Sequence, residues 1–163
     1  MLVWNGNMTD ITYMKGDATY PQEDGKKLII HCCNDEGKWG KGFVLAITKR
    51  WPEVEKKYRE WYRSDENFDL GNIQAVKVEK DIAVVNMIGQ HGIYANKGVA
   101  PIRYKAIESC LVKVGDLAEK YNASVCAPRF GAGLAGGKWE EIEGMILELL
   151  CARDMKVTIY DYD

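Results

Sequence analysis

The chain has 163 residues and a formal net charge of −2, with 47% hydrophobic and 28% charged residues. This length fits one domain, over 1–163, whose core needs no disulfide or metal to be stable. The slight negative charge argues against non-specific binding to nucleic acid or to an anionic membrane. A single small anionic ligand is still compatible with it, because such a ligand needs only a local positive site.

The start of the chain and the cysteines indicate a cytoplasmic protein. The stretch MLVWNGNMTD lacks the positive and apolar regions of a secretory signal, so we expect 1–9 to be a short extension or a packed end of the domain. No run approaches the roughly 20 apolar residues of a membrane span. The cysteines are odd in number and lie in or beside apolar segments, which favours buried free thiols over disulfides; they are Cys32, Cys33, Cys110, Cys126 and Cys151.

Strands and helices alternate after the first predicted strand. Short apolar or alternating runs indicate strands, and apolar residues spaced three and four apart indicate helices. The expected elements are a strand over 10–17, a strand over 26–34, a helix over 42–51, a second helix opened by Pro52, strands Ile73–Val78 and Ile82–Met87 joined by a turn at Lys80-Asp81, a helix over 102–121, a strand over 124–128, a helix over 138–150 and a closing strand in KVTIYDYD. This order predicts an α/β fold with a helix-covered, mixed sheet.

Two glycine-rich loops follow strands and precede helices. The first lies in HCCNDEGKWGKG (31–42) and the second in PRFGAGLAGGKW (128–139). Glycine lets backbone N–H groups approach a ligand, and a helix start adds unpaired N–H groups and the positive end of the helix dipole. Open α/β sheets bind ligands outside the carboxyl ends of their strands. Together the loops predict a phosphate-bearing ligand, although a tight turn explains either loop alone.

Other ligand motifs fit poorly. Neighbouring Cys32 and Cys33 should point to opposite faces of a strand, and no C-x-x-C pair exists, so a Cys/His zinc site is not expected. No ligand cluster has zinc or magnesium spacing, so we expect no metal, and we expect no other cofactor. GAGLAG matches G-x-G-x-x-G, but no acidic residue ends a strand about 20 residues further on, as a dinucleotide site requires. The Gly-Lys-Ser/Thr of a P-loop is missing as well.

Three stretches carry a family resemblance. GDAT after the first strand, IIHCCNDEGKWGKGFVLAI at the first loop and PRFGAGLAGGKW at the second resemble the macro domain family. Within it they resemble the branch that includes the terminal ADP-ribose protein glycohydrolase and the yeast ADP-ribose-1″-phosphate phosphatase. The resemblance runs from about Asp10 to Tyr162. It implies a three-layer α/β/α sandwich around a mixed, mostly parallel sheet, with a cleft that binds ADP-ribose.

The resemblance also implies binding residues. Asp17, next to Ala18, would accept a hydrogen bond from the adenine amino group, while a strand-ending turn is the plain alternative. Asn34 would contact the distal ribose, and Tyr160 or Tyr162 would stack on adenine, with core packing an equal alternative for Tyr160. The loop residues expected around the distal ribose and diphosphate are Gly37, Trp39, Gly40, Gly42, Gly131, Ala132, Gly133 and Leu134, of which Trp39 would crowd or cap the ribose.

Candidate catalytic residues lie in two segments. His31 matches a histidine proposed as catalytic in the yeast phosphatase, and its usual pKa near ~6.5 suits acid–base chemistry, but a hydrogen-bonded core histidine is the alternative. Asp35 and Glu36 are candidate bases beside it. Gln90 and His91, in NMIGQHGIYANKG, would form a third wall near the distal ribose or a flexible surface loop.

The chain departs from the glycohydrolase branch at Ala135, where that branch has an Asp, so the covalent Lys/Asp mechanism of the branch should be absent.

We expect binding of ADP-ribose, with hydrolysis of a derivative at the distal ribose. The candidates are ADP-ribose-1″-phosphate, an O-acyl-ADP-ribose and an ADP-ribosylated macromolecule, which correspond to a phosphatase or an ADP-ribosyl hydrolase. The alternative is a non-catalytic reader of ADP-ribose.

Overall fold

The computed structural model describes residues 9–162, so most of the expected N-terminal extension lies outside the described residues. Within these residues every predicted element is present, and a short 3₁₀ turn is the one addition. The elements are β1 (Ile11–Lys15), β2 (Lys27–Asn34), α1 (Phe43–Arg50), α2 (Pro52–Ser64), β3 (Ile73–Glu79), β4 (Ile82–Gln90), α3 (Tyr104–Tyr121), β5 (Ser124–Ala127), α4 (Trp139–Leu149), the 3₁₀ turn (Cys151–Arg153) and β6 (Val157–Asp161).

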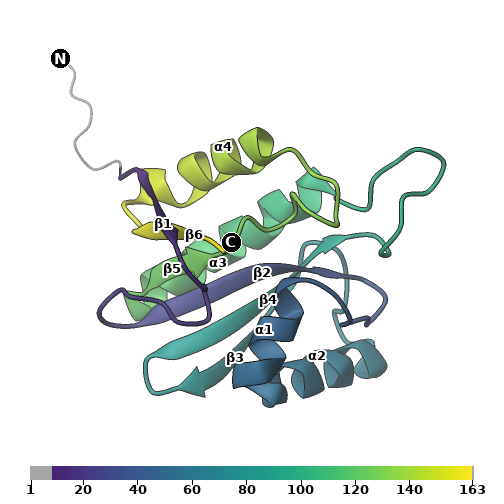
Figure 1. Ribbon diagram of the computed structural model, residues 1–163, viewed down its shortest axis with the longest axis horizontal. Helices are drawn as coiled ribbons and strands as arrows, with labels where there is room; N and C mark the ends of the chain where they lie inside the picture. The colour runs from purple at the N-terminus through teal and green to yellow at the C-terminus, as the bar shows by residue number, and fades with distance from the viewer. Residues whose placement is uncertain (1–8, 163) are drawn as a thin grey trace.

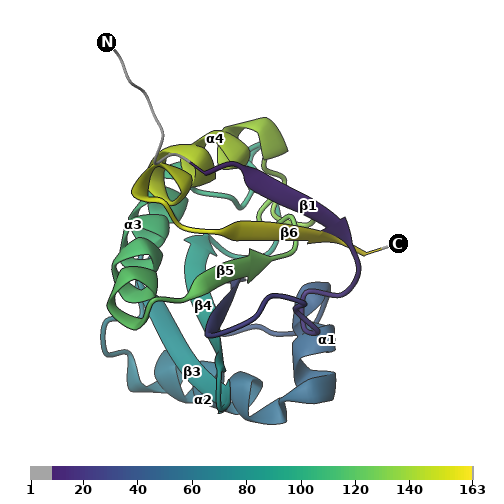
Figure 2. The same cartoon turned by 90° about the vertical axis from the view of Figure 1, so that its left-hand side faces the viewer.

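The sheet is mixed and mostly parallel, as predicted. Its strand order is β1-β6-β5-β2-β4-β3. All neighbouring pairs are parallel except β3 with β4, which run antiparallel through the turn at Lys80-Asp81. Helices α1 and α2 cover one face and α3 and α4 cover the other, which confirms the three-layer sandwich (Figures 1 and 2). Among residues 9–162, no helix is long and apolar enough to cross a membrane.

Strand β2 shows how alternation divides the core between the two faces. Ile30 and the half-buried Cys32 pack toward α3 and α4, whereas Ile29 and Cys33 pack toward α1 and α2. The ring of His31 lies on the side of Cys33, with Cys33 Sγ 3.8 Å from its Nε2 atom. Cys32 and Cys33 therefore point to opposite faces, as expected, and His31 shares the face of Cys33.

The parallel strands fix where the loops gather. Because β1, β2, β4, β5 and β6 run in one direction, the segments that follow them leave the sheet at the same edge. Three of these segments matter below: the first loop (35–42) after β2, the second loop (128–138) after β5, and the third loop (91–103) after β4.

Candidate functional site

The three loops contact one another and form a continuous surface. The first and third loops meet where the Asp35 N–H donates to the Gln90 carbonyl at 3.1 Å. The third and second meet where the Ile102 N–H donates to the Ala135 carbonyl at 3.0 Å. A Cβ placed on Gly42 would lie 3.6 Å from Leu134 Cδ1, so the first and second loops also adjoin. The two glycine loops therefore meet at one edge of the sheet, as the sequence predicts.

Asn34 shapes the first loop. Its Nδ2 donates to the Lys38 carbonyl at 2.7 Å, and its Oδ1 accepts from the backbone N–H groups of Glu36 and Lys38 at 2.9 and 3.1 Å. Buried Tyr58 donates through its hydroxyl to the Asn34 carbonyl at 2.6 Å. Contact of Asn34 with the distal ribose stays a prediction, since its amide here holds the loop. The sequence did not indicate this contact of Tyr58, because helical spacing does not report what a hydroxyl binds.

Trp39 and His31 lie beneath the first loop. Trp39 is 5% exposed, its Nε1 donates to Thr48 Oγ1 at 2.7 Å, and its ring packs edge-on to His31 with centroids 5.5 Å apart. His31 is 1% exposed, with Nε2 2.5 Å from Asn86 Oδ1. Burial lowers the pKa of His31 to about 4. Catalysis by His31 and ribose capping by Trp39 stay predictions, and this buried placement gives them no support.

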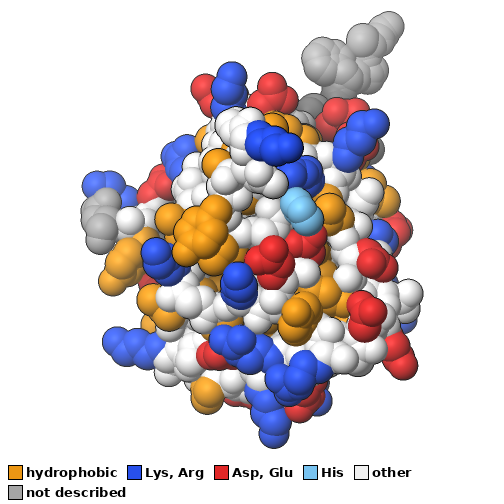
Figure 3. All heavy atoms as spheres, turned by 90° about the vertical axis from the view of Figure 1, so that its right-hand side faces the viewer, with side chains coloured by type: hydrophobic (Ala, Val, Ile, Leu, Met, Phe, Trp, Pro, Cys, Tyr) orange, Lys and Arg blue, Asp and Glu red, His pale blue; other side chains and the backbone are white. Residues whose placement is uncertain are grey.

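Asp35 and His91 form a hydrogen-bonded pair on the loop surface. Asp35 Oδ2 lies 2.7 Å from His91 Nδ1, and Asp35 Oδ1 accepts from the Gly92 N–H at 2.8 Å. The Asp35 side chain is 19% exposed and that of His91 is 57% exposed. A carboxylate only accepts, so Nδ1 carries a proton, and in the neutral imidazole Nε2 has the free lone pair. On this face a histidine lies next to acidic side chains (Figure 3). The structure thus joins two candidates that the sequence named separately.

Glu36 and Gln90 flank this pair. Glu36 is exposed and forms an ion pair with Lys38 at 3.2 Å. A Cβ on Gly92 would lie 3.3 Å from Glu36 Oε2, so Glu36 also reaches the third loop. Gln90 donates through Nε2 to the Gly92 carbonyl at 3.0 Å. Both side chains therefore lie close to Asp35 and His91, and Gln90 is tied to the backbone of the third loop.

The second loop is closed by its own backbone. The Gly137 N–H donates to the Gly131 carbonyl at 2.7 Å, and the Gly136 N–H donates to the Gly133 carbonyl at 3.0 Å. Gly131 is buried, Ala132 is half-buried, and Gly133 is exposed. Leu134 is 67% exposed at the rim beside Gly42. Exposed backbone next to a closed turn suits a diphosphate, because backbone N–H groups can bind its oxygens.

The turn after β1 carries the residues expected at adenine. Asp17 Oδ1 accepts from the Thr19 N–H at 2.8 Å and the Thr19 hydroxyl at 2.7 Å, with Ala18 buried beside it. Tyr160 is buried and donates through its hydroxyl to Glu23 Oε1 at 2.7 Å, which matches the core alternative. Its pKa is raised by burial.

Arg50 is a residue of this turn that the sequence did not indicate. It donates to the Thr19 carbonyl, and its guanidinium lies 4.0 Å from the centroid of the Tyr20 ring. The end of α1 therefore fixes the turn after β1. Nothing in the helical spacing of residues 42–51 signals that contact.

In the part of the chain that the structure describes, no three His, Cys, Asp or Glu side chains converge as metal ligands would.

Solved structures share this fold. A protein of unknown function from Bacteroides thetaiotaomicron is 53% identical, with a TM-score of 0.92 over 93% of this chain and 98% of that one. A macrodomain protein from Streptomyces coelicolor is 48% identical, with a TM-score of 0.85 over 94% of this chain and 100% of that one. The chain therefore belongs to the macro domain family. No protein-family model matches it.

Curated relatives differ in length and in what their names say. The chromodomain-helicase-DNA-binding protein 1-like of Danio rerio is 32% identical over 94% of this chain, but the chain spans only 16% of that protein. The ADP-ribose 1″-phosphate phosphatase of Candida albicans is 27% identical over 85% of this chain and 92% of that protein. The human ADP-ribose glycohydrolase OARD1 is 24% identical over 92% of this chain and 90% of that protein.

Proposed function

We propose that the protein binds ADP-ribose on the surface of the three loops and hydrolyses an ADP-ribose derivative at the distal ribose. The observation that carries this is the Asp35–His91 pair, held at 2.7 Å where β2 and β4 end, beside two glycine-rich loops. Relatives named as a phosphatase and as a glycohydrolase of ADP-ribose support the same ligand. Which bond is cleaved depends on which ADP-ribose derivative is the substrate.

Each part of the surface has a role in this proposal. Asp17 accepts from the adenine amino group, and backbone N–H groups of the glycine loops bind the diphosphate. The distal ribose then lies beside His91. The Nε2 lone pair of His91 takes a proton from water, whose oxygen bonds to the reacting carbon or phosphorus, and the leaving group departs with the electron pair of its broken bond. Asp35 fixes the tautomer of His91 and stabilises the imidazolium that forms.

The test is hydrolysis of ADP-ribose-1″-phosphate and of an ADP-ribosylated protein by matched variants. We expect His91→Ala and Asp35→Asn to lower kcat at least about tenfold, since a positioned base usually contributes about 10²–10⁴-fold. Affinity for ADP-ribose, measured by titration calorimetry, should change by no more than a few-fold. Glu36→Gln is the control, because it neutralises the adjacent carboxylate and leaves the pair intact. Equal rates in wild type and His91→Ala would refute the catalytic role.

A reader function is the second candidate, favoured by buried Ala135 in place of the Asp of the glycohydrolase branch. Micromolar binding of ADP-ribose without turnover of either substrate would select it. Absence of binding at millimolar ADP-ribose would refute the ligand assignment for both candidates.

A further inference from the structure

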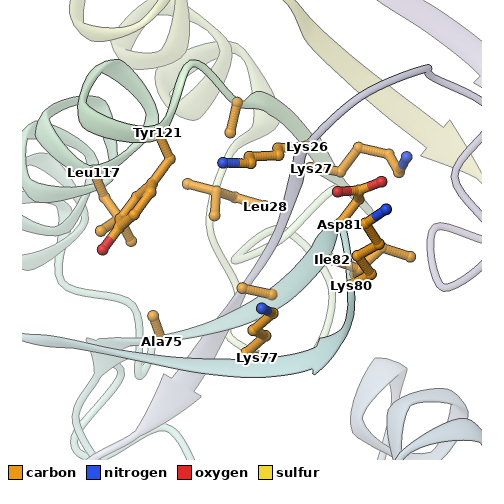
Figure 4. Close-up of a pocket in the computed structure, with 12 residues that line it drawn as sticks. Lys26, Lys27, Leu28, Ala75, Lys77, Lys80, Asp81, Ile82, Leu117 and Tyr121 are labelled. Atoms are coloured by element: carbon orange, nitrogen blue, oxygen red, sulfur yellow. The ribbon is translucent and has the colours of Figure 1, made fainter.

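A hollow lies at the opposite edge of the sheet from the three loops. It has a volume of about 410 Å³ and is lined by the amino ends of β2 and β4, the last turn of α3 and part of β3. Leu117 and Tyr121 of α3 form one side, while Ala75 and Lys77 of β3 lie across from them (Figure 4). We call this hollow the lysine groove. Its volume falls in the range of about 300–1,000 Å³ that is usual for small-molecule sites.

The groove is open because α3 leaves one end of the sheet uncovered. On β3, Val76 is buried against the α1 and α2 layer, whereas Ala75 and Lys77 on the other face are exposed. The helix ends at Tyr121, beside the start of β5. Short side chains at Ala75 and Ala83 leave space between the strands and the helix end. The floor is therefore apolar.

Positive charge is concentrated around this floor. Four lysines line the groove, Lys26, Lys27, Lys77 and Lys80, against one acidic residue, Asp81. Lys27 donates to the carbonyls of Glu23 and Gly25. Among residues 9–162, no carboxylate lies within 4.0 Å of the amines of Lys26, Lys77 or Lys80. A chain of net charge −2 thus gathers unneutralised cations at one site, where an anionic ligand would supply the missing charge.

An aromatic ring borders the same site. Tyr121 is 47% exposed, and the amines of Lys26 and Lys120 lie 5.9 and 5.4 Å from its ring centroid. An apolar floor, an exposed ring and amines within a few ångström of that ring suit a ligand with a flat base and several negative charges. A ligand with charge alone would leave the ring and the floor without a role.

We propose that the lysine groove binds a nucleoside polyphosphate, with the phosphates on Lys26, Lys77 and Lys80 and the base against Tyr121. This site is separate from the loop surface and does not depend on the function proposed there. The same chemistry occurs in a free nucleotide and at the end of a nucleic-acid strand, which the experiment below distinguishes.

The probe is UTP, which lacks the adenine amino group that Asp17 would bind. Calorimetry at low salt should show binding, and Lys77→Glu/Lys80→Glu should weaken it at least about tenfold, because two nearby charges are reversed. The control is Lys49→Glu/Lys56→Glu, which makes the same charge change on α1 and α2 and should leave affinity within about twofold. ADP-ribose at the lowest concentration that saturates the loop surface should not displace UTP, and Asp17→Asn should leave UTP binding unchanged.

Further ligands decide what the groove recognises. Tyr121→Ala should bind UTP no better than inorganic triphosphate, whereas the wild type should prefer UTP. A thymidine octamer that binds more tightly than UTP, and is weakened by Lys77→Glu/Lys80→Glu, would assign the ligand to a nucleic-acid strand. Absence of UTP binding, displacement of UTP by ADP-ribose, equal loss in the control variant, or equally tight binding of an oligoglutamate would each overturn the proposal.

Discussion

Protonation of His31 should make the fold unstable in mild acid. Asn86 Nδ2 donates to Gln74 Oε1 at 3.0 Å, so the Oδ1 atom of Asn86 is the acceptor for His31 Nε2–H. Burial lowers the pKa of this imidazole to about 4, so the ring is neutral in the folded state at neutral pH. The histidine of the unfolded chain has a pKa near ~6.5. Between pH ~4 and ~6.5 the unfolded chain therefore binds a proton that the folded chain does not bind.

The size of the effect follows from this difference in pKa. Because the unfolded state takes up the proton first, the free energy of unfolding falls as the pH falls below ~6.5. About 2.5 pKa units at ~1.4 kcal/mol each give roughly 3 kcal/mol by pH ~4, and about 2 kcal/mol by pH ~5. A loss of this size is a large part of the stability of an ordinary domain, about 5–15 kcal/mol.

Urea unfolding of wild type and His31→Gln at a series of pH values measures the effect. Gln does not titrate and keeps a donor toward Asn86. Carboxylates such as Asp161, whose pKa is lowered by the hydrogen bond from Arg129, contribute equally to both proteins. We expect wild type to lose about 2 kcal/mol more than the variant between pH ~8 and ~5. Parallel pH profiles, or an NMR titration of His31 near pH ~6.5, would refute the reasoning.

Two further substitutions test the loops and the adenine turn. Asp17→Asn keeps an oxygen for the N–H of Thr19 but loses the carboxylate charge, so calorimetry should show ADP-ribose binding weakened by about 1–3 kcal/mol; unchanged affinity would place adenine elsewhere. Gly37→Ala should lower the free energy of unfolding by about 1–3 kcal/mol, because Gly37 has φ +72° and its new Cβ would lie 2.4 Å from the Tyr62 ring. Gly40→Ala, with no atom within 4 Å of the new Cβ, is the control and should unfold like wild type.

The sequence predicted the elements and the meeting of the glycine loops because both depend on local pattern and on strand direction. Pro52 opens α2 at its first turn, as expected, and β2 divides its side chains between the two faces by alternation. Once β2 and β5 are parallel, the segments after them must leave the sheet at the same edge. These inferences need no long-range side-chain detail.

Side-chain partners at the site could not be predicted in the same way. Alternation places His31 and Cys33 on one face, but it does not say that Trp39 folds back to cover His31. The hydroxyl of Tyr58 binds Asn34 across 24 residues of sequence, and Arg50 contacts Thr19 across 31. Spacing along one element carries no information about such contacts, because they depend on how α1 and α2 dock against the sheet.

The pairing of Asp35 with His91 depends on an irregularity at the end of the sheet. Along β2 and β4, Cys33 is level with Ile88, but the next residue, Asn34, is level with Gln90, so β4 carries one extra residue at Gly89. Without it, Asp35 would be level with Gln90 instead of His91. A Cβ on Gly89 would lie 2.3 Å from Ile107 Cδ1, so a larger residue there would have to displace the Ile107 side chain of α3. Bulges commonly re-aim side chains next to active sites, and this one brings a histidine beside the carboxylate that orients it.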